Sequence, residues 1–148
     1  MRHNMENQTF LALYKGKGTI CNAIVRWWTG SIYSHCEIVV NGICYSSSRM
    51  DGGVRCKKID LNSGRWDVLK IEADVKDRVI AVYEVTKGNK YNWFGIFGAQ
   101  VLNWRYRKQN KFFCSEWCAH ALGLPYPQTF APHTLLAIIG YLNDDKYF

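Results

Sequence analysis

The sequence has no apolar run of the roughly 18 to 20 residues that a helix needs to cross a membrane. Its N-terminal stretch, MRHNMENQTFLALYKGKG, has only a brief apolar segment before lysines and glycines follow. That segment is too short for the hydrophobic part of a signal peptide. Both absences argue against export and membrane insertion, so we expect a cytoplasmic protein without a transmembrane segment.

The chain also has no Cys-x-x-Cys pair, the commonest spacing of zinc ligands. Its six cysteines occupy positions 21, 36, 44, 56, 114 and 118. An even number suits disulfides in a small secreted domain, but reduced thiols are the rule inside a cell. We expect no metal and no other cofactor, and we expect most cysteines to be small core residues, with one of them reactive.

Internal repeats, low-complexity tracts and Pro- or Ser-rich linkers are absent as well, which predicts a single domain over residues 1–148. Apolar residues make up 48% of the chain and charged residues only 21%. This composition is typical of a globular protein and excludes a disordered or fibrous one.

The net charge of +7 favours anionic partners such as nucleic acid or a phospholipid surface. Part of the excess lies in WRYRKQNK, residues 104–111, where Arg105, Arg107, Lys108 and Lys111 are interleaved with aromatic residues. Such a segment can stack on bases or pair with phosphates. A solvated basic loop is the plainer interpretation, and both stay open.

The periodicity of apolar residues divides the chain into short strands and helices. Alternation predicts strands, besides those of a hairpin described next, in three segments: 8–14, 51–61 after an initial turn, and 65–73. Helical spacing predicts helices in four segments: 18–30, 74–88, 114–124 and 131–142. Segment 91–104 fits a helix or an irregular structure equally well. The expected fold is α+β, with a small antiparallel sheet packed against helices.

The segment YSHCEIVVNGICYSSS, residues 33–48, is predicted to form a β-hairpin. Asn41 and Gly42 favour a two-residue type I′ turn because both residue types adopt positive φ readily. Such a turn pairs Val40 with Ile43. The hairpin register follows from that pair.

Four polar side chains share one face of this hairpin, since the register places Ser46 opposite Glu37 and Ser48 opposite His35. A polar face of this kind is commonly the solvent side of an antiparallel sheet. It can equally be a functional site. The hairpin alone does not decide between the two.

Cys114 lies in FFCSEWCAHALGL, residues 112–124, where it is predicted to open a helix. Free backbone N–H groups and the positive end of the helix dipole lower the pKa of a thiol in that position. A neighbouring imidazole would lower it further and supply a general acid, and the Cys114 amide could help to stabilise an oxyanion. Cys118, one turn further, is interpreted as structural. A buried, inert Cys114 is the alternative.

The order of these motifs resembles the circularly permuted branch of the NlpC/P60 papain-like superfamily, especially the YiiX-like and YebB-like hydrolases. The matching features are a strand histidine in SHCEIVV, a glycine turn, YSSSRMDGGVR, and much later the cysteine helix FFCSEWCAHALGL. In unpermuted members the cysteine helix precedes the histidine strand. The resemblance covers roughly residues 8–140. Its specific part is two short motifs, the one around the strand histidine and the one around the helix cysteine.

The resemblance implies a permuted papain-like fold, in which Cys114 on a helix is the nucleophile and His35 on the adjoining strand is the base. It also implies a third residue that orients the imidazole, usually from the next strand, where this chain has Ser46 and Ser48 in place of an acidic or amide residue. Glu37 offers a carboxylate, which holds an imidazolium more strongly than a hydroxyl does. We favour Glu37, with Ser48 and Ser46 as alternatives.

Four further residues are candidates near such a site. Tyr33 and Ser34 precede the histidine and could line a substrate pocket, although ordinary packing explains a tyrosine at a strand start. His120 could replace His35 as the base, but helical geometry points it away from Cys114. His133 could also serve, without a motif to support it.

These features predict a cysteine hydrolase or acyltransferase that acts on an amide or an acyl ester. The superfamily implies peptide, isopeptide, cell-wall peptide or acyl-lipid substrates. The missing signal peptide argues against cell-wall peptides, and the basic, aromatic character favours an acyl lipid or another anionic molecule. The rivals are a non-enzymatic module that binds nucleic acid or a host partner, and a redox pair of Cys114 and Cys118.

Overall fold

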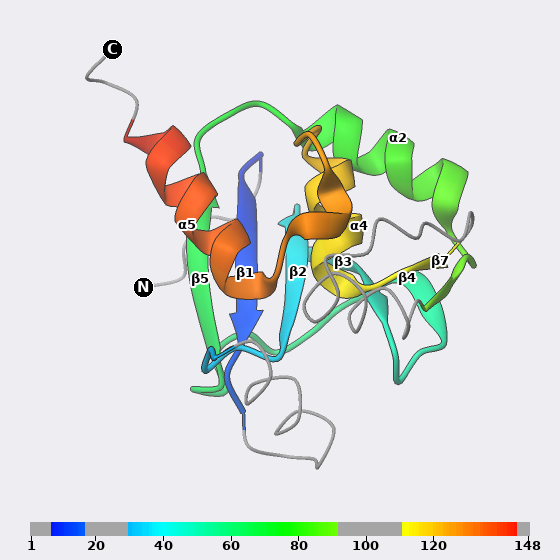
Figure 1. Ribbon diagram of the computed structural model, residues 1–148, viewed down its shortest axis with the longest axis horizontal. Helices are drawn as coiled ribbons and strands as arrows, with labels where there is room; N and C mark the ends of the chain where they lie inside the picture. Colours follow the sequence, from blue (N-terminus) through cyan, green and yellow to red (C-terminus); the bar gives the residue numbers. More distant parts are fainter. Residues whose placement is uncertain (1–6, 17–29, 92–110, 145–148) are drawn as a thin grey trace.

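The computed structural model describes residues 7–16, 30–91 and 111–144 (Figure 1). A seven-stranded sheet runs through them in the order β5-β1-β2-β3-β4-β6-β7. The neighbouring strands are antiparallel, except that β6 and β7 are parallel. The strands are β1 (Thr9–Tyr14), β2 (His35–Val40), β3 (Ile43–Ser48), β4 (Gly53–Lys57), β5 (Trp66–Ile71), β6 (Lys90–Tyr91) and β7 (Lys111–Phe112).

Three helices pack against this sheet, and α4 lies between the other two in Figure 1. α4 contacts β2 and β3, α2 contacts α4 and β4, and α5 contacts α4 and β5. The helices are α2 (Lys76–Thr86), α4 (Cys114–Ala121) and α5 (Pro132–Asn143), with a short 3₁₀ turn, η2 (Pro127–Thr129), before α5. The predicted α+β fold, with a small sheet packed against helices, is confirmed.

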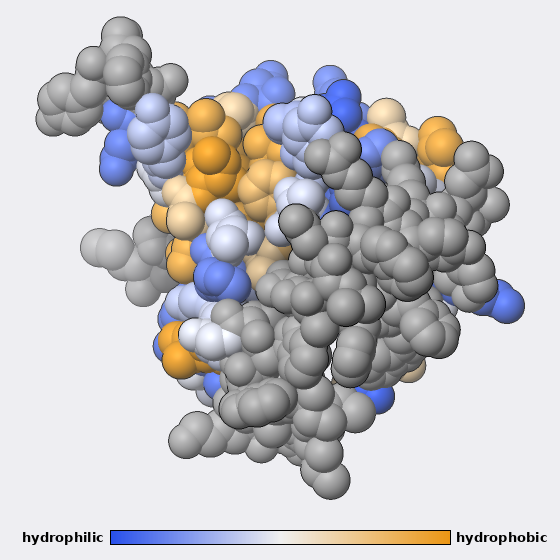
Figure 2. Space-filling model, in the orientation of Figure 1, coloured by the Kyte–Doolittle hydropathy of each residue, from blue (hydrophilic) through white to orange (hydrophobic). Residues whose placement is uncertain are grey.

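The main hydrophobic core lies between the sheet and the helices. Leu13 of β1 and Ile38 of β2 point into it, and Trp117 of α4 and Leu135 of α5 meet them there. All four are fully buried. Figure 2 shows apolar residues, in orange, gathered on the surface of the region where α5 lies.

A smaller core covers the opposite face of the sheet. Because side chains alternate along a strand, Phe10 and Val39 point away from the helices. Ile59 and Leu61 of the connection between β4 and β5 cover them, together with Trp66 at the start of β5. Both faces of the central strands are therefore buried, and a polar side chain on either face needs a partner.

Two hydrogen bonds fix α4 in place. The Trp117 indole Nε1 donates to the Thr86 hydroxyl of α2 at 2.8 Å, and the Ser115 hydroxyl donates to the Phe130 carbonyl at 2.6 Å. The helix begins at Cys114, as predicted, because Phe113 before it is extended, with φ −91° and ψ 167°. It ends before Gly123, which has φ +78°.

The predicted hairpin is confirmed near its turn. Asn41 has φ 50° and Gly42 has φ 78°, and Val40 pairs with Ile43. The register between β2 and β3 runs only as far as the pair of Ile38 with Tyr45. The predicted pairs of Glu37 with Ser46 and of His35 with Ser48 are not part of this ladder.

The remaining segment predictions divide into those that the structure describes and those that it does not. The strands predicted in 8–14, 51–61 and 65–73 and the helices predicted in 74–88 and 114–124 are found within those limits, and the helix predicted in 131–142 is found as α5, which ends one residue later, at Asn143. The predicted helix over 18–30 and the undecided segment 91–104 lie almost wholly outside the described residues. The two-residue strands β6 and β7 and the turn η2 have no counterpart among the predictions.

We predict that Gly53→Ala destabilises the fold by about 3 kcal/mol, through overpacking and backbone strain together. Gly53 has φ +149°, and a Cβ there would lie 1.9 Å from the Asn89 carbonyl oxygen. The backbone that carries this oxygen also accepts a hydrogen bond from the Val54 N–H at 2.8 Å, so it cannot move away freely. Urea unfolding measures the loss.

Gly52→Ala is the matched control for this prediction. Gly52 also has positive φ, +82°, but a Cβ there meets nothing within 4 Å. Gly52→Ala should destabilise the fold only by the conformational penalty of about 1 to 2 kcal/mol. Equal losses for the two variants would show that the close approach of Gly53 to Asn89 does not matter.

Candidate active site

β2 presents His35 and Glu37 on the same face, since they are the first and third residues of the strand. His35 Nε2 lies 3.0 Å from Glu37 Oε1. The Glu37 side chain is fully buried, whereas the His35 side chain is 20% exposed. The interpretation of this face as an ordinary solvent-facing one is therefore wrong, because a buried carboxylate holds the imidazole from the interior side.

α4 brings Cys114 to the same end of β2. Cys114 is the first residue of the helix, and its side chain forms a hydrogen bond with the side chain of His35. The residue is buried, with 4% of its surface exposed. The thiol and the imidazole, which the sequence predicted to meet, are thus neighbours in the fold.

Cys36 lies between His35 and Glu37 in sequence and points to the helix side of β2. Its sulfur lies 3.7 Å from that of Cys118, and its side chain also forms a hydrogen bond with Cys114. Burial raises the pKa of the Cys36 thiol well above its ordinary value, and the hydrogen bonds with Cys114 and Cys118 raise it further. Cys36 therefore tends to keep its proton, and its thiol donates to the sulfur of Cys118.

The pKa of the Cys114 thiol lies well below its ordinary value. The hydrogen bond with the Cys36 thiol contributes most, and it outweighs burial, which by itself would raise the pKa. The positive charge of His35, a hydrogen bond with its side chain and a hydrogen bond from the Cys36 backbone lower the pKa further. These contacts favour the thiolate form of Cys114.

The pKa of the His35 imidazole is shifted in the opposite direction, upward. Burial by itself would lower the pKa of its imidazole, but the negative charges of Cys114 and Glu37, and hydrogen bonds with both, raise it to about 10. The two shifts have the directions that favour a thiolate–imidazolium pair. This pair is the usual state of an activated cysteine nucleophile with its general acid.

Glu37 is held from the other side by Arg55 of β4. Arg55 Nη1 donates to Glu37 Oε2 at 2.8 Å, and Nη2 donates to Oε1. Burial alone would raise the pKa of Glu37, but His35 and Arg55 together lower it, so the carboxylate stays ionised. Arg55 is in turn bound by Asp51, which accepts a hydrogen bond from Nε at 2.7 Å.

Ser46 and Ser48, the two alternatives to Glu37, have partners other than His35. The Ser46 hydroxyl donates to the Cys36 carbonyl at 2.7 Å and lies 4.0 Å from the Cys118 sulfur. Ser48 pairs with Gly53 at the far end of the β3–β4 ladder and is buried. Since only Glu37 has a direct bond to the imidazole among these three, the geometry favours it as the orienting residue.

Tyr33 and Ser34 lie just before β2. The Tyr33 hydroxyl donates to Asp67 at 2.6 Å, which raises the pKa of the phenol to about 12. Ser34 is buried, and its hydroxyl has no hydrogen-bond partner within the described ranges. Both residues stay candidates for substrate contacts, although the Tyr33 hydroxyl is already bonded to Asp67 of β5.

The alternative bases are found on helices. His120 lies near the end of α4, whereas Cys114 opens that helix. His133 lies in the first turn of α5. Of the histidines in the described part of the chain, His35 is the one that interacts with Cys114.

The predicted anionic-ligand segment cannot be placed. Arg105, Arg107 and Lys108 lie outside the described residues. For Lys111 only the backbone is described, and it belongs to β7.

Sequence reasoning missed two residues of the cluster, Arg55 and Cys36. Arg55 comes from a strand whose register depends on the turn around Gly52, and no pattern in the sequence pairs it with Glu37. Cys36 was interpreted as a small core residue. Its position between two predicted site residues was the available signal, but alternation along a strand assigns it to the opposite face.

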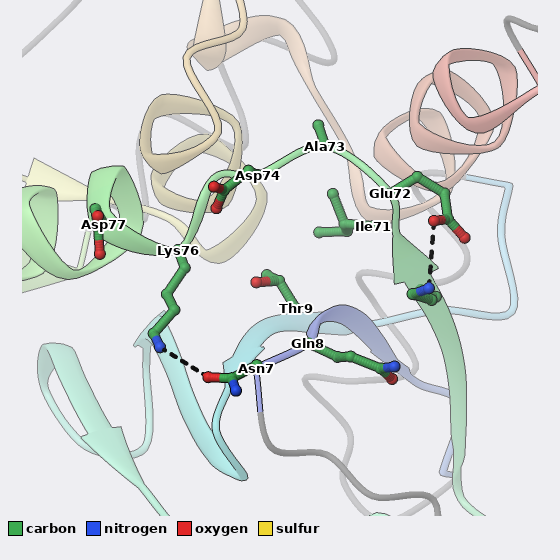
Figure 3. Close-up of a pocket in the computed structure, with 10 residues that line it drawn as sticks. Asn7, Gln8, Thr9, Ile71, Glu72, Ala73, Asp74, Lys76 and Asp77 are labelled. Carbon is green, nitrogen blue, oxygen red and sulfur yellow. Dashed lines mark hydrogen bonds and ion pairs between the residues drawn. The ribbon is translucent and has the colours of Figure 1, made fainter.

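Figure 3 shows a polar pocket of about 560 Å³ between the start of β1, the end of β5 and the start of α2. Lys76 donates to Asn7 at its rim, at 3.5 Å. The pocket borders Thr9, at the opposite end of β1 from Tyr14, which pairs with His35. It is therefore separate from the cysteine cluster.

Three further observations concern the described part of the chain alone. In it, no three His, Cys, Asp or Glu side chains are grouped so that they could hold a metal ion. None of the helices assigned there is long and apolar enough to cross a membrane. The five cysteines described there form no disulfide, and Cys56 is the exposed one.

Compared with known proteins, this chain matches no family model, and no curated protein matches its sequence. Its function is therefore argued from the geometry of the site.

We predict that iodoacetamide alkylates Cys114 at a rate that is nearly constant between pH 6 and pH 8. The pKa of the Cys114 thiol is lowered well below its ordinary value, so its thiolate fraction should change little over this range. Free cysteine, with a pKa of about 8.5, should accelerate roughly tenfold per pH unit below that value. Peptide mapping by mass spectrometry gives the rate for each cysteine.

His35→Ala should raise the pKa of Cys114 and slow its alkylation at pH 6 by about tenfold or more, which corresponds to one pKa unit. His120→Ala, on the same helix as Cys114, is the matched control and should leave the rate unchanged. A pH profile for Cys114 that follows that of free cysteine would contradict the ion pair.

Proposed function

We propose that this protein is a cysteine hydrolase or acyltransferase that works through an acyl-enzyme on Cys114. The observation that carries the proposal is the contact between Cys114 at the start of α4 and His35 at the start of β2, with Glu37 bonded to Nε2 of the imidazole. Nucleophile, base and orienting group therefore stand in the order that this chemistry requires.

Each residue has a distinct role in the proposed reaction. The Cys114 thiolate attacks the carbonyl carbon of an amide or ester. The His35 imidazolium gives its proton to the leaving amine or alcohol as the C–N or C–O bond breaks, and then takes a proton from the water or alcohol that attacks the thioester. Glu37 fixes the ring orientation and stabilises the imidazolium.

The backbone supplies one donor for the oxyanion. The N–H of Cys114 is the first of α4, and the first N–H groups of a helix have no partner within the helix. It adjoins the nucleophile, so it suits the negative charge that develops on the carbonyl oxygen in the tetrahedral intermediate. The helix dipole acts in the same direction.

The motif order supports a particular kind of hydrolase. A histidine strand that precedes a cysteine helix is the motif order of the circularly permuted NlpC/P60 papain-like proteins, and this chain resembles them in that order. That resemblance supports an amide or acyl-ester substrate. Peptide, isopeptide and acyl-lipid substrates are all compatible with the cluster.

We predict that p-nitrophenyl acetate acetylates Cys114 with release of p-nitrophenolate. The thiolate–ester reaction breaks the ester C–O bond and leaves an acetyl thioester, which mass spectrometry of rapidly quenched protein locates. Cys114→Ala should abolish the modification. His35→Ala should slow it by a factor of about 10² to 10⁴, the usual contribution of a general acid–base group.

Cys56→Ser is the matched control, because Cys56 is the exposed cysteine among those described. It should leave the reaction unchanged. Acetylation spread over several cysteines, or found at Cys114 but insensitive to His35, would contradict the proposed function. Retention of every cellular activity by Cys114→Ala would point to the non-enzymatic binding module instead.

A further inference from the structure

We propose that Arg55 is a positioning residue for this reaction: it holds the Glu37 carboxylate against His35 and balances the charge of the buried cluster. The inference rests on the proposed function and deepens it. It concerns a residue that neither contacts Cys114 nor belongs to the three reacting and orienting groups described above.

The first argument is the geometry of the Arg55 fork. Nη1 and Nη2 donate to the two different oxygens of Glu37, and Nε donates to Asp51. Glu37 Oε1 is shared between Arg55 and His35. Because a bidentate guanidinium fixes both the position and the plane of a carboxylate, Arg55 determines where Oε1 meets the imidazole.

The second argument is the packing around Arg55. Only 15% of its side chain is exposed, and Glu37 is fully buried. Asp51 also accepts a hydrogen bond from Lys57, at 2.8 Å, so the group that holds Arg55 is itself held. The arginine is therefore fixed on both sides. A lysine could supply the charge but not the planar fork.

The third argument is a charge balance. In the active state Cys114 and Glu37 are negative, and His35 and Arg55 are positive, so the four groups together are neutral. A net charge left in a buried site is costly, and the site responds by taking up or losing a proton. Without Arg55, one excess negative charge would remain on these groups.

The other titratable groups that face Glu37 and Cys114 do not supply the missing positive charge. Cys44 of β3 faces Glu37, and its thiol pKa is raised to about 12 by burial and then by the charge of Glu37. Cys36 of β2 and Cys118 of α4 face Cys114, and neither can carry a positive charge. Removal of Arg55 should therefore leave the uncompensated negative charge of Glu37 beside Cys114, and this charge raises the pKa of the nucleophile.

The test is the pH profile of Cys114 alkylation by iodoacetamide in Arg55→Gln. The acid midpoint is the pH at which the alkylation rate of Cys114 has fallen to half of its plateau value. We expect Arg55→Gln to raise this midpoint by about one pH unit, so that the rate at a pH below the midpoint falls about tenfold. Arg65→Gln, which removes the same charge from an exposed side chain, is the matched control and should not move it. A thermal melt establishes that each variant is folded at the assay temperature.

The double variant Glu37→Gln/Arg55→Gln separates charge balance from a purely structural role. It removes one charge of each sign, so the acid midpoint should return toward that of the native protein. Its acetylation by p-nitrophenyl acetate should stay slow, since His35 has lost its orienting group. If Arg55→Gln alone does not fold, the double variant becomes the test. A near-native acid midpoint together with slow acetylation supports the inference, and any other result overturns it.

Arg55→Lys tests the fork itself. It should keep a near-native acid midpoint, because the charge is retained, and should acetylate about tenfold more slowly, because one ammonium cannot hold both oxygens of Glu37. Native behaviour in both assays would overturn the positioning role.

The outcomes distinguish the two proposals. If Cys114 in the native protein reacts like free cysteine, the proposed function fails and this inference fails with it. If Cys114 is activated in the native protein but Arg55→Gln, folded, has the same acid midpoint, the role of Arg55 is overturned and the proposed function stands.

Discussion

The proposed chemistry depends on one contact, between the first residue of α4 and the first two residues of β2. Cys114 forms hydrogen bonds with the thiol and the backbone of Cys36 and with the side chain of His35. Trp117 and Ser115 hold the helix in the register that makes this contact possible, through Thr86 of α2 and Phe130 before α5. A shift of α4 by one residue would move the Cys114 sulfur away from both Cys36 and His35.

The electrostatics of the cluster follow from its burial. Ionised groups are expensive in the interior unless opposite charges and hydrogen bonds compensate them. Here a thiolate meets an imidazolium, and a carboxylate meets that imidazolium and a guanidinium. Each charge therefore has an opposite neighbour, which explains why the pKa of Glu37 is lowered although its side chain is fully buried.

Much of the local structure was predictable. Asn41 and Gly42 determine a hairpin through their backbone preferences, and the alternation around them sets its first pairs. Cys114 was predictable as the start of a helix. The continuation of the hairpin register was not, because β3 leaves the ladder with β2 after Tyr45, where Ser46 bonds to the Cys36 carbonyl instead. Packing of α4 on both strands overrides the simple extension of the ladder.

The sequence by itself determined the turn, the strand that carries His35 and Glu37, and the helix that begins at Cys114, because each depends on residues close together in the chain. Only the tertiary structure decided that the helix end meets the strand end, that Glu37 rather than a serine holds His35, and that Arg55 holds Glu37. Those contacts join residues from β2, β4 and α4, and their geometry depends on how the whole core packs, which no local pattern encodes.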